Sequence, residues 1–200
     1  MEVKRVIFDS EAQNVTVFVD ISNLDKSVKA KNVRVNYKEF REYLSKRFNA
    51  RIVNAYTSSN PDGSSSSFHD MLELNGYRLK KCRPQMDRYG RTHEKEVDTS
   101  LVIDMVKCVS KGMSNHVVLV SGDRDMLPAV EAVQQEGCLV TLLTFTNEGC
   151  DSSLVRICDN HVLLCKEGDE ALGVIQFDPE VVRSSDGTVA SGDYGMDVVE

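Results

Sequence analysis

Acidic side chains follow two apolar stretches of the chain, at the points where strands are expected to end. Asp20 comes directly after 15–19 (Val-Thr-Val-Phe-Val), and Asp123 and Asp125 come shortly after 117–120 (Val-Val-Leu-Val). In a parallel sheet with helices on both faces, ligands bind outside the carboxyl ends of the strands, where the chain turns into the next helix. We therefore expect these carboxylates to lie at one edge of a sheet, in reach of a ligand.

A third acid, Asp98, stands near the start of the helix expected over 97–110. On that helix it shares a stripe with Leu101 and Met105, the face expected to pack on the sheet. A carboxylate on a buried stripe is costly unless something compensates it, and a metal ion would do so. The alternative is an acid that complements the helix dipole at the N-terminus.

Taken together, Asp20, Asp98 and Asp123 predict a shared cation. Converging carboxylates repel one another, and a divalent cation removes that repulsion. Oxygen-only ligation suits Mg²⁺ or Mn²⁺, whereas zinc is a poor fit because His and Cys are absent from the three segments. Such a cation activates water to attack a phosphodiester and stabilises the leaving oxygen. The competing interpretation is that Asp20 and Asp123 each cap the segment after its strand.

Asp104 is a separate case. It lies six residues after Asp98, which is about 9 Å along a helix axis. Direct ligation of the same ion is therefore not expected. Asp104 either acts through an intervening water or a second ion, or is a solvated or hydrogen-bonded residue at the flank of the apolar stripe.

Short β-branched stretches alternate with amphipathic helical stretches along 14–166. Strands are expected at 15–19, 51–57, 77–82, 117–121, 138–143 and 161–165, and helices at 37–49, 68–74, 97–110, 126–135 and 152–158. The segment 83–95 is polar and irregular. Strands separated by helices indicate an α/β fold with a mostly parallel sheet covered on both faces. Residues 1–13 are an N-terminal extension, and 167–200 are expected to be a flexible tail.

Three blocks of sequence carry a resemblance to a known family. They are Phe-Val-Asp-Ile-Ser-Asn-Leu at 18–24, Lys-Glu-Val-Asp-Thr-Ser-Leu-Val-Ile-Asp-Met at 95–105, and Leu-Val-Ser-Gly-Asp-Arg-Asp-Met-Leu-Pro at 119–128. A weaker fourth block is Ser-Ser-Leu at 152–154 with Asp159. In order and spacing the chain resembles the NYN domain, in its LabA-like branch, of the PIN-like nuclease superfamily.

The resemblance implies a three-layer α/β/α sandwich whose acidic cluster binds Mg²⁺ or Mn²⁺ and cleaves RNA. On this basis Asp20, Asp98 and Asp123 match the metal-binding acids of the family. Asp125 matches a further acid near the site, and Asn23 matches the polar residue that orients the first aspartate. With Asn23, Ser121 is expected to position acids or water. The sequence departs from the family pattern at Ile21 and Glu96, where Gly is common, and at Met126, where Phe is frequent.

Two groups of basic residues flank the expected acidic edge. One group follows the first strand in an expected loop, and the other precedes Asp98; they consist of Lys26, Lys29, Lys31 and Arg34, and of Arg78, Lys80, Lys81, Arg83, Arg88, Arg91 and Lys95. Lys and Arg contact phosphates, and neighbouring aromatic side chains can stack on single-stranded bases. The two groups predict RNA binding, and the alternative is ordinary solvated surface charge.

The net charge of −7 is concentrated in the expected tail. Residues 167–200 carry nine acids and one base, whereas residues 1–166 carry 23 bases and 22 acids. The body is therefore free to meet a polyanion. The tail either competes with nucleic acid for the basic groups or merely keeps the protein soluble.

Composition narrows the class of protein further. The six cysteines form no Cys-x-x-Cys pair, which favours free, mostly buried thiols in a reducing cytoplasm. Apolar runs fall far short of the roughly 20 residues that span a bilayer, so no membrane contact is expected. Two functions stay open: a metal-dependent ribonuclease, and a non-catalytic module that binds nucleic acid or protein on the same fold. A protein partner or a second copy of the chain is left open as well.

Overall fold

A six-stranded sheet organises the part of the chain that the computed structural model describes, which is residues 14–59, 65–82, 85–86, 92–93, 95–166 and 173–177. The strand order is β4-β3-β1-β7-β8-β9, and all five pairings are parallel. The strands are β1 (Val15–Asp20), β3 (Ile52–Ser58), β4 (Arg78–Cys82), β7 (His116–Val120), β8 (Leu139–Thr144) and β9 (Asn160–Leu163). The predicted parallel sheet is confirmed.

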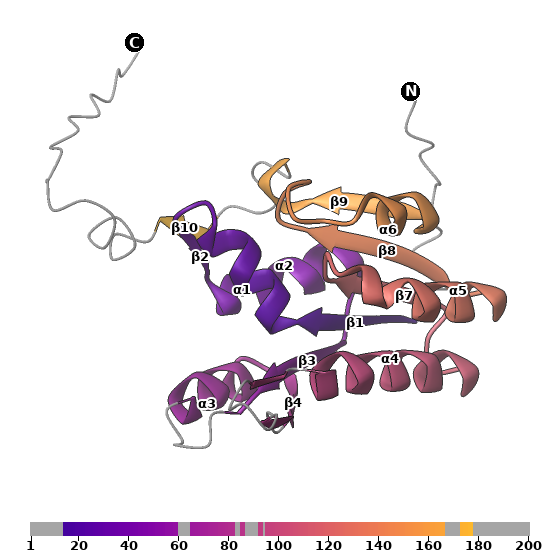
Figure 1. Ribbon diagram of the computed structural model, residues 1–200, viewed down its shortest axis with the longest axis horizontal. Coiled ribbons are helices and arrows are strands. Elements are labelled where there is room, and N and C mark those ends of the chain that lie inside the picture. Colours follow the sequence, from indigo (N-terminus) through magenta and orange to yellow (C-terminus); the bar gives the residue numbers. More distant parts are fainter. Residues whose placement is uncertain are drawn as a thin grey trace, which may run out of the picture.

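Helices cover both faces of the sheet, so the molecule has three layers (Figure 1). One core joins Val17 and Val19 of β1 to α1 (Ile21–Lys29), α2 (Tyr37–Phe48) and α3 (Ser66–Leu74). The other joins Phe18 to α4 (Lys95–Ser110), α5 (Leu127–Gln135) and α6 (Ser152–Ile157). Alternate residues of one strand supply the two cores because successive side chains point to opposite faces. The predicted α/β/α sandwich is therefore confirmed.

The direction in which strands are added to the sheet reverses between β1 and β7. After β1 the chain builds β3 and β4 on one side, then returns through α4 to place β7 on the other side of β1. Loops that follow β1 and β7 therefore leave the sheet in opposite directions, which defines a topological switch point. The register pairs Val19 with Val120, so Asp20 and Ser121 continue the two strands at the same level.

The segment after β1 differs from the prediction. The segment is predicted to be a loop, and this prediction is wrong, because Ile21–Lys29 forms α1. Its buried residues, Ile21, Leu24 and Val28, repeat at helical spacing, and the acid before them accepts a hydrogen bond from Asn23 N–H as an N-cap. Only three apolar residues among polar ones carry this signal, which explains why it was missed.

A second difference concerns the expected tail. Residues Ile175–Phe177 form β10, which pairs antiparallel with β2 (Val33–Val35). Val174, just before it, is 1% exposed in the first core, and its carbonyl accepts a hydrogen bond from Asn36 N–H at 2.7 Å. The expectation that 167–200 is a flexible tail is therefore wrong for residues 173–177.

Two short strands also occur in the segment expected to be irregular. They are β5 (Gln85–Met86) and β6 (Thr92–His93), which pair with each other antiparallel. The remaining helices and strands lie within one or two residues of their predicted ends, with Arg124–Met126 adding a 3-10 turn, η2, before α5.

The cysteines follow the prediction except at one position. Burial raises the pKa of Cys138 to about 11 and that of Cys158 to about 12, which keeps both thiols protonated. Cys82 and Cys108 are also buried, and Cys150 is partly so. Cys165 is exposed, contrary to expectation, because β9 ends at Leu163 and a 3-10 turn, η3 (Leu164–Lys166), follows. Within the described ranges, no helix combines the length and apolar character that crossing a membrane requires.

Candidate functional site

The ends of β1 and β7 are joined by hydrogen bonds at the switch point. Asp20 is only 3% exposed, and both of its carboxylate oxygens accept hydrogen bonds. Asn23 N–H donates to Oδ1 at 3.0 Å, and the buried Ser121 hydroxyl donates to Oδ2 at 3.4 Å. The first aspartate is therefore fixed by one group from its own helix and one from the neighbouring strand.

Further bonds extend this connection to the second acidic segment. Ser121 Oγ accepts from Asp123 N–H at 3.2 Å, and Asn23 Oδ1 accepts from Gly122 N–H at 2.8 Å. Asp125 N–H donates in turn to Asp123 Oδ1 at 3.0 Å. We call these residues the switch-point network; its members are Asp20, Asn23, Ser121, Gly122, Asp123 and Asp125. Five of the predicted site residues are thus brought together.

The two aspartates of the network also have a structural role. Asp20 is the N-cap of α1, and Asp123 is the N-cap of η2. The capping interpretation of these acids is therefore confirmed. Capping uses some of the lone pairs of each carboxylate and leaves the metal-binding prediction untested.

Asp98 lies in the first turn of α4, next to Val97, which is 2% exposed. Leu101 and Met105, both 0% exposed, continue the buried stripe, whereas Asp98 is half-buried at its side. The helix packs against β1 and against η2, the turn that Asp123 begins. Asp98 is thus on a helix that contacts both acidic segments.

The fit of this arrangement to a cation can be judged from its donors. Throughout the described ranges, no group of three or more His, Cys, Asp or Glu side chains is arranged to hold a metal ion. Asp20, Asp98 and Asp123 therefore do not form a closed set of ligands. Mg²⁺ commonly binds through one or two carboxylates and completes its shell with waters and substrate phosphates. An open, all-oxygen edge of this kind suits such an ion.

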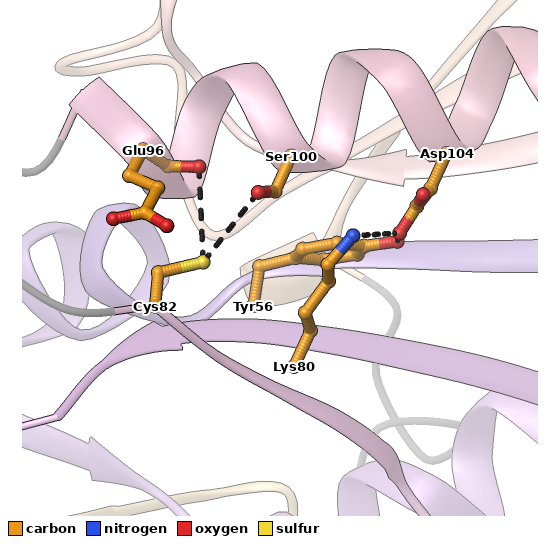
Figure 2. A network of polar contacts seen from close by, with 6 residues as sticks. All are labelled: Tyr56, Lys80, Cys82, Glu96, Ser100 and Asp104. Atoms are coloured by element: carbon orange, nitrogen blue, oxygen red, sulfur yellow. Dashed lines mark hydrogen bonds and ion pairs between the residues drawn. The ribbon is translucent and has the colours of Figure 1, made fainter.

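Asp104 has two direct partners on the sheet (Figure 2). Its Oδ2 accepts a hydrogen bond from the Tyr56 hydroxyl at 3.1 Å and lies 2.7 Å from Lys80 Nζ. Of the two interpretations of Asp104, the structure shows the hydrogen-bonded flank residue. Burial raises the pKa of Tyr56, and the Asp104 carboxylate raises it further, so the hydroxyl keeps the proton that it donates.

Those predicted RNA-binding residues that the structure describes lie on both sides of the network. Lys31 forms an ion pair with Glu148 in the loop after β8. Lys80 and Lys81 are on the edge strand β4, within the strand predicted at 77–82. Lys80 pairs with Asp104, and Lys81 pairs with Glu73 at 3.0 Å. Lys26 and Lys29 lie on α1, Arg34 on β2 and Arg78 on β4, all exposed. Arg83, Arg88 and Arg91 are outside the described residues, as is the side chain of Lys95, where α4 begins.

Two residues of the site were missed from sequence. Gly122 lies where a Cβ would stand 2.9 Å from Gly149 O and 3.1 Å from the Cα of Cys150. Its place between Ser121 and Asp123 was the available signal. Tyr56 had no such signal, since its partner Asp104 is 48 residues away.

A shallow groove borders the network on the α1 side. Its lining includes Asn23 and Ser27 of α1, Gly122, and Thr144, Thr146 and Cys150 from the end of β8 and the loop after it.

Comparison with known proteins agrees with this architecture. The family model of the NYN domain matches residues 14–165. No curated protein matches the chain. A solved structure of a protein of unknown function from Vibrio parahaemolyticus is 22% identical to this chain and superposes with a TM-score of 0.66. The match covers 79% of this chain and 94% of the Vibrio chain. That similarity shows the fold alone. Because the family model spans well over half of the sequence, this chain belongs to the NYN domain family of the PIN-like nuclease superfamily.

Proposed function

We propose that this protein is a divalent-metal-dependent ribonuclease that hydrolyses RNA phosphodiester bonds at the carboxyl edge of its sheet. The observation that carries the proposal is the hydrogen-bonded path from Asp20 through Ser121 to Asp123. It joins the carboxylate of Asp20 to the backbone of Asp123 at the switch point of a chain from a nuclease superfamily. Ligands of open parallel sheets bind at such points.

In this proposal Asp20, Asp98 and Asp123 would hold Mg²⁺ or Mn²⁺ between them, one or two of them directly and the rest through bound water. The bound cation would supply a water of lowered pKa and would stabilise the leaving oxygen. Asn23 and Ser121 orient Asp20 through the bonds to its two oxygens. Asp125 assists by fixing Asp123, to which its N–H donates.

The basic residues would hold the RNA backbone on both sides of the network. The first group consists of Lys29, Lys31 and Arg34, and the second of Lys80, Lys81, Arg83, Arg88, Arg91 and Lys95. Three of these lysines already pair with acids. Exposed ion pairs contribute only about 0–1 kcal/mol, so a phosphate can replace the acid at modest cost.

Cleavage of a labelled single-stranded RNA tests the proposal. Wild-type protein should cleave in Mn²⁺ and stop in EDTA. Asp20→Asn and Asp123→Asn should each lower the rate by about 100-fold or more, because the loss of a ligand removes several kcal/mol of transition-state stabilisation. Asparagine caps helices about as well as aspartate, so both variants should remain folded.

The matched control is Glu136→Gln, which neutralises one exposed carboxylate just after α5, at the opposite edge of the sheet. It should cleave like the wild type. Circular dichroism and urea unfolding should show that all variants are folded. Cleavage that survives in Asp20→Asn, or that needs no divalent cation, contradicts the proposal.

A second function, a non-catalytic module that binds nucleic acid or protein, has one observation in its favour. Asp20 and Asp123 both cap helical segments, and this role alone would account for their presence. On that account the protein binds RNA with the same affinity with or without Mn²⁺ and leaves it intact. Binding measured by fluorescence anisotropy beside the cleavage assay separates the two functions.

A further inference from the structure

We infer that Tyr56 is a positioning residue of the proposed site. It fixes helix α4, which carries Asp98, relative to the end of β1, which carries Asp20. The inference rests on the proposed function. Tyr56 touches neither aspartate in this account and acts through the contact between its hydroxyl and Asp104.

Tyr56 lies on β3, which pairs with β1 on one side and with β4 on the other. Its backbone is the register partner of Asp20 across the β1–β3 pairing. The side chain is 1% exposed, and its ring stacks on Phe18 with centroids 6.3 Å apart and an interplanar angle of 21°. The position of this hydroxyl is therefore set by the strand pair that also sets Asp20.

The hydroxyl reaches the middle of α4, where a third element joins the contact. Tyr56 Oη and Lys80 Nζ both bind Oδ2 of Asp104, so β3, β4 and α4 meet at one carboxylate oxygen (Figure 2). Hydrogen bonds to a charged acceptor are stronger than those between neutral groups. The Tyr56 hydroxyl can keep its bond to Asp104 when Lys80 turns to a phosphate, and this bond therefore opposes both sliding and rotation of the helix.

A second contact holds the first turns of the same helix. The Cys82 thiol, at the end of β4, lies 3.7 Å from Glu96 O and 3.6 Å from Ser100 Oγ (Figure 2). Positions 96, 100 and 104 are four residues apart and therefore form one stripe along α4. This stripe faces the β4 side of the sheet.

Asp98 lies on the other flank of α4. At 3.6 residues per turn it stands roughly 160° around the helix from the middle of the β4-facing stripe. That flank is the one turned toward η2 and α5, with which α4 is in contact. A rotation of α4 that the Asp104 contact prevents would therefore move Asp98 relative to Asp20 and Asp123.

The test compares two tyrosines that lose the same atom. Tyr56→Phe removes the hydroxyl that binds Asp104. Tyr77→Phe is the matched control, because its buried hydroxyl donates to Tyr37 O at 2.7 Å within the core on the opposite face. Full-length protein is titrated with Mn²⁺ in the absence of RNA, and the free ion is measured by electron paramagnetic resonance.

We expect Tyr56→Phe to bind Mn²⁺ about 10-fold more weakly than wild type, as for residues that orient metal ligands. Tyr77→Phe should bind as wild type does, although both variants lose thermal stability. Equal Mn²⁺ affinity of the two folded variants overturns the positioning role and leaves the proposed function intact. If instead wild-type protein binds no Mn²⁺, the proposed function itself fails.

A second variant covers the case in which Tyr56→Phe does not fold. Asp104→Ala removes the same contact from the helix side, and Asp70→Ala, at an exposed position of α3, is its control. Weaker Mn²⁺ binding by Asp104→Ala alone supports the inference. Equal binding by the two alanine variants overturns it.

Discussion

Gly122 is the residue at which the backbone of the candidate site has least room. A Cβ there would meet two backbone atoms of the loop after β8, at 2.9 and 3.1 Å. The same residue donates to Asn23 and accepts from Asp151 N–H at 3.0 Å. We predict that Gly122→Ala lowers the free energy of unfolding by about 1–3 kcal/mol and also reduces RNA cleavage, because Asp123 moves with the displaced turn.

Urea unfolding and the cleavage assay check this prediction. Gly112→Ala is the control, since Gly112 has a positive φ of 66° but nothing within 4 Å of a Cβ. That variant should lose stability through backbone strain alone and should keep full cleavage. A Gly122→Ala protein as stable and active as the wild type contradicts the steric argument.

His116 predicts a pH dependence of stability. It is 4% exposed, its Nε2 lies 2.8 Å from Thr141 Oγ1, and burial lowers its pKa below 6.5, although Asp159 partly opposes the shift. Just below pH 6.5, His116 therefore binds a proton in the unfolded chain but not in the folded chain. Stability is fully retained above pH 6.5 and falls below it, by at most about 1.4 kcal/mol per pH unit for one proton.

The measurement is the free energy of unfolding in urea at pH 7.5, 6.5 and 5.5. His116→Gln should flatten the dependence, whereas His161→Gln should flatten it separately, because burial lowers the pKa of His161 as well. Parallel curves for wild type and His116→Gln would show that His116 contributes nothing to it.

At this scale the sequence predicts positions better than partners. The places of Asp20 and Asp123 follow from the strands before them, and their capping is the alternative that the sequence leaves open beside a metal site. Neither Tyr56 nor Lys80 could be assigned to Asp104, because the strand register that brings them together is decided by pairings far apart in the chain. The separation of Asp104 from Asp98, by contrast, follows from helix geometry alone.

At the scale of elements, the pair formed by β2 and β10 is the least expected. Its strands have three residues each and lie about 140 positions apart, so no local pattern announces them. The central strands and longer helices were found because their periodicity is sustained over many residues. Helix α1 lies between these cases, with a cap and three apolar residues as its whole signal.

We predict that β10 stabilises the domain. A chain that ends at residue 172 loses the buried side chain of Val174 and the pairing with β2. Burial of one such side chain contributes about 1.5–3 kcal/mol. The free energy of unfolding of this truncated chain should therefore be about 2 kcal/mol lower than that of the full-length protein. A chain that ends at Phe177 keeps the strand and should unfold in urea like the full-length protein. Identical midpoints for the two truncated chains would show that β10 adds nothing.

At the scale of the whole molecule, the net negative charge is concentrated in the C-terminal part of the sequence. Residues 178–200 hold six acids and one base, and so contribute −5 to the net charge of −7. This segment begins directly after β10, and β10 pairs with β2, the strand that carries Arg34. The acidic segment is therefore attached beside the first basic group, at a place that sequence alone did not indicate.

We predict that a chain ending at Phe177 binds single-stranded RNA more tightly than the full-length protein, because removal of the acidic segment leaves a net charge near −2 and fewer acids to compete with phosphate. Fluorescence anisotropy in EDTA, which prevents metal-dependent cleavage, should show the difference at about 50 mM salt and lose it near 1 M, where the Debye length is about 3 Å.

A full-length chain in which the six acids of 178–200 are replaced by Asn or Gln should bind as the truncated chain does, since charge and not length is the cause. If that variant binds like the wild type while the truncated chain binds more tightly, steric exclusion and not charge explains the effect; if neither differs from wild type, the segment does not oppose RNA binding.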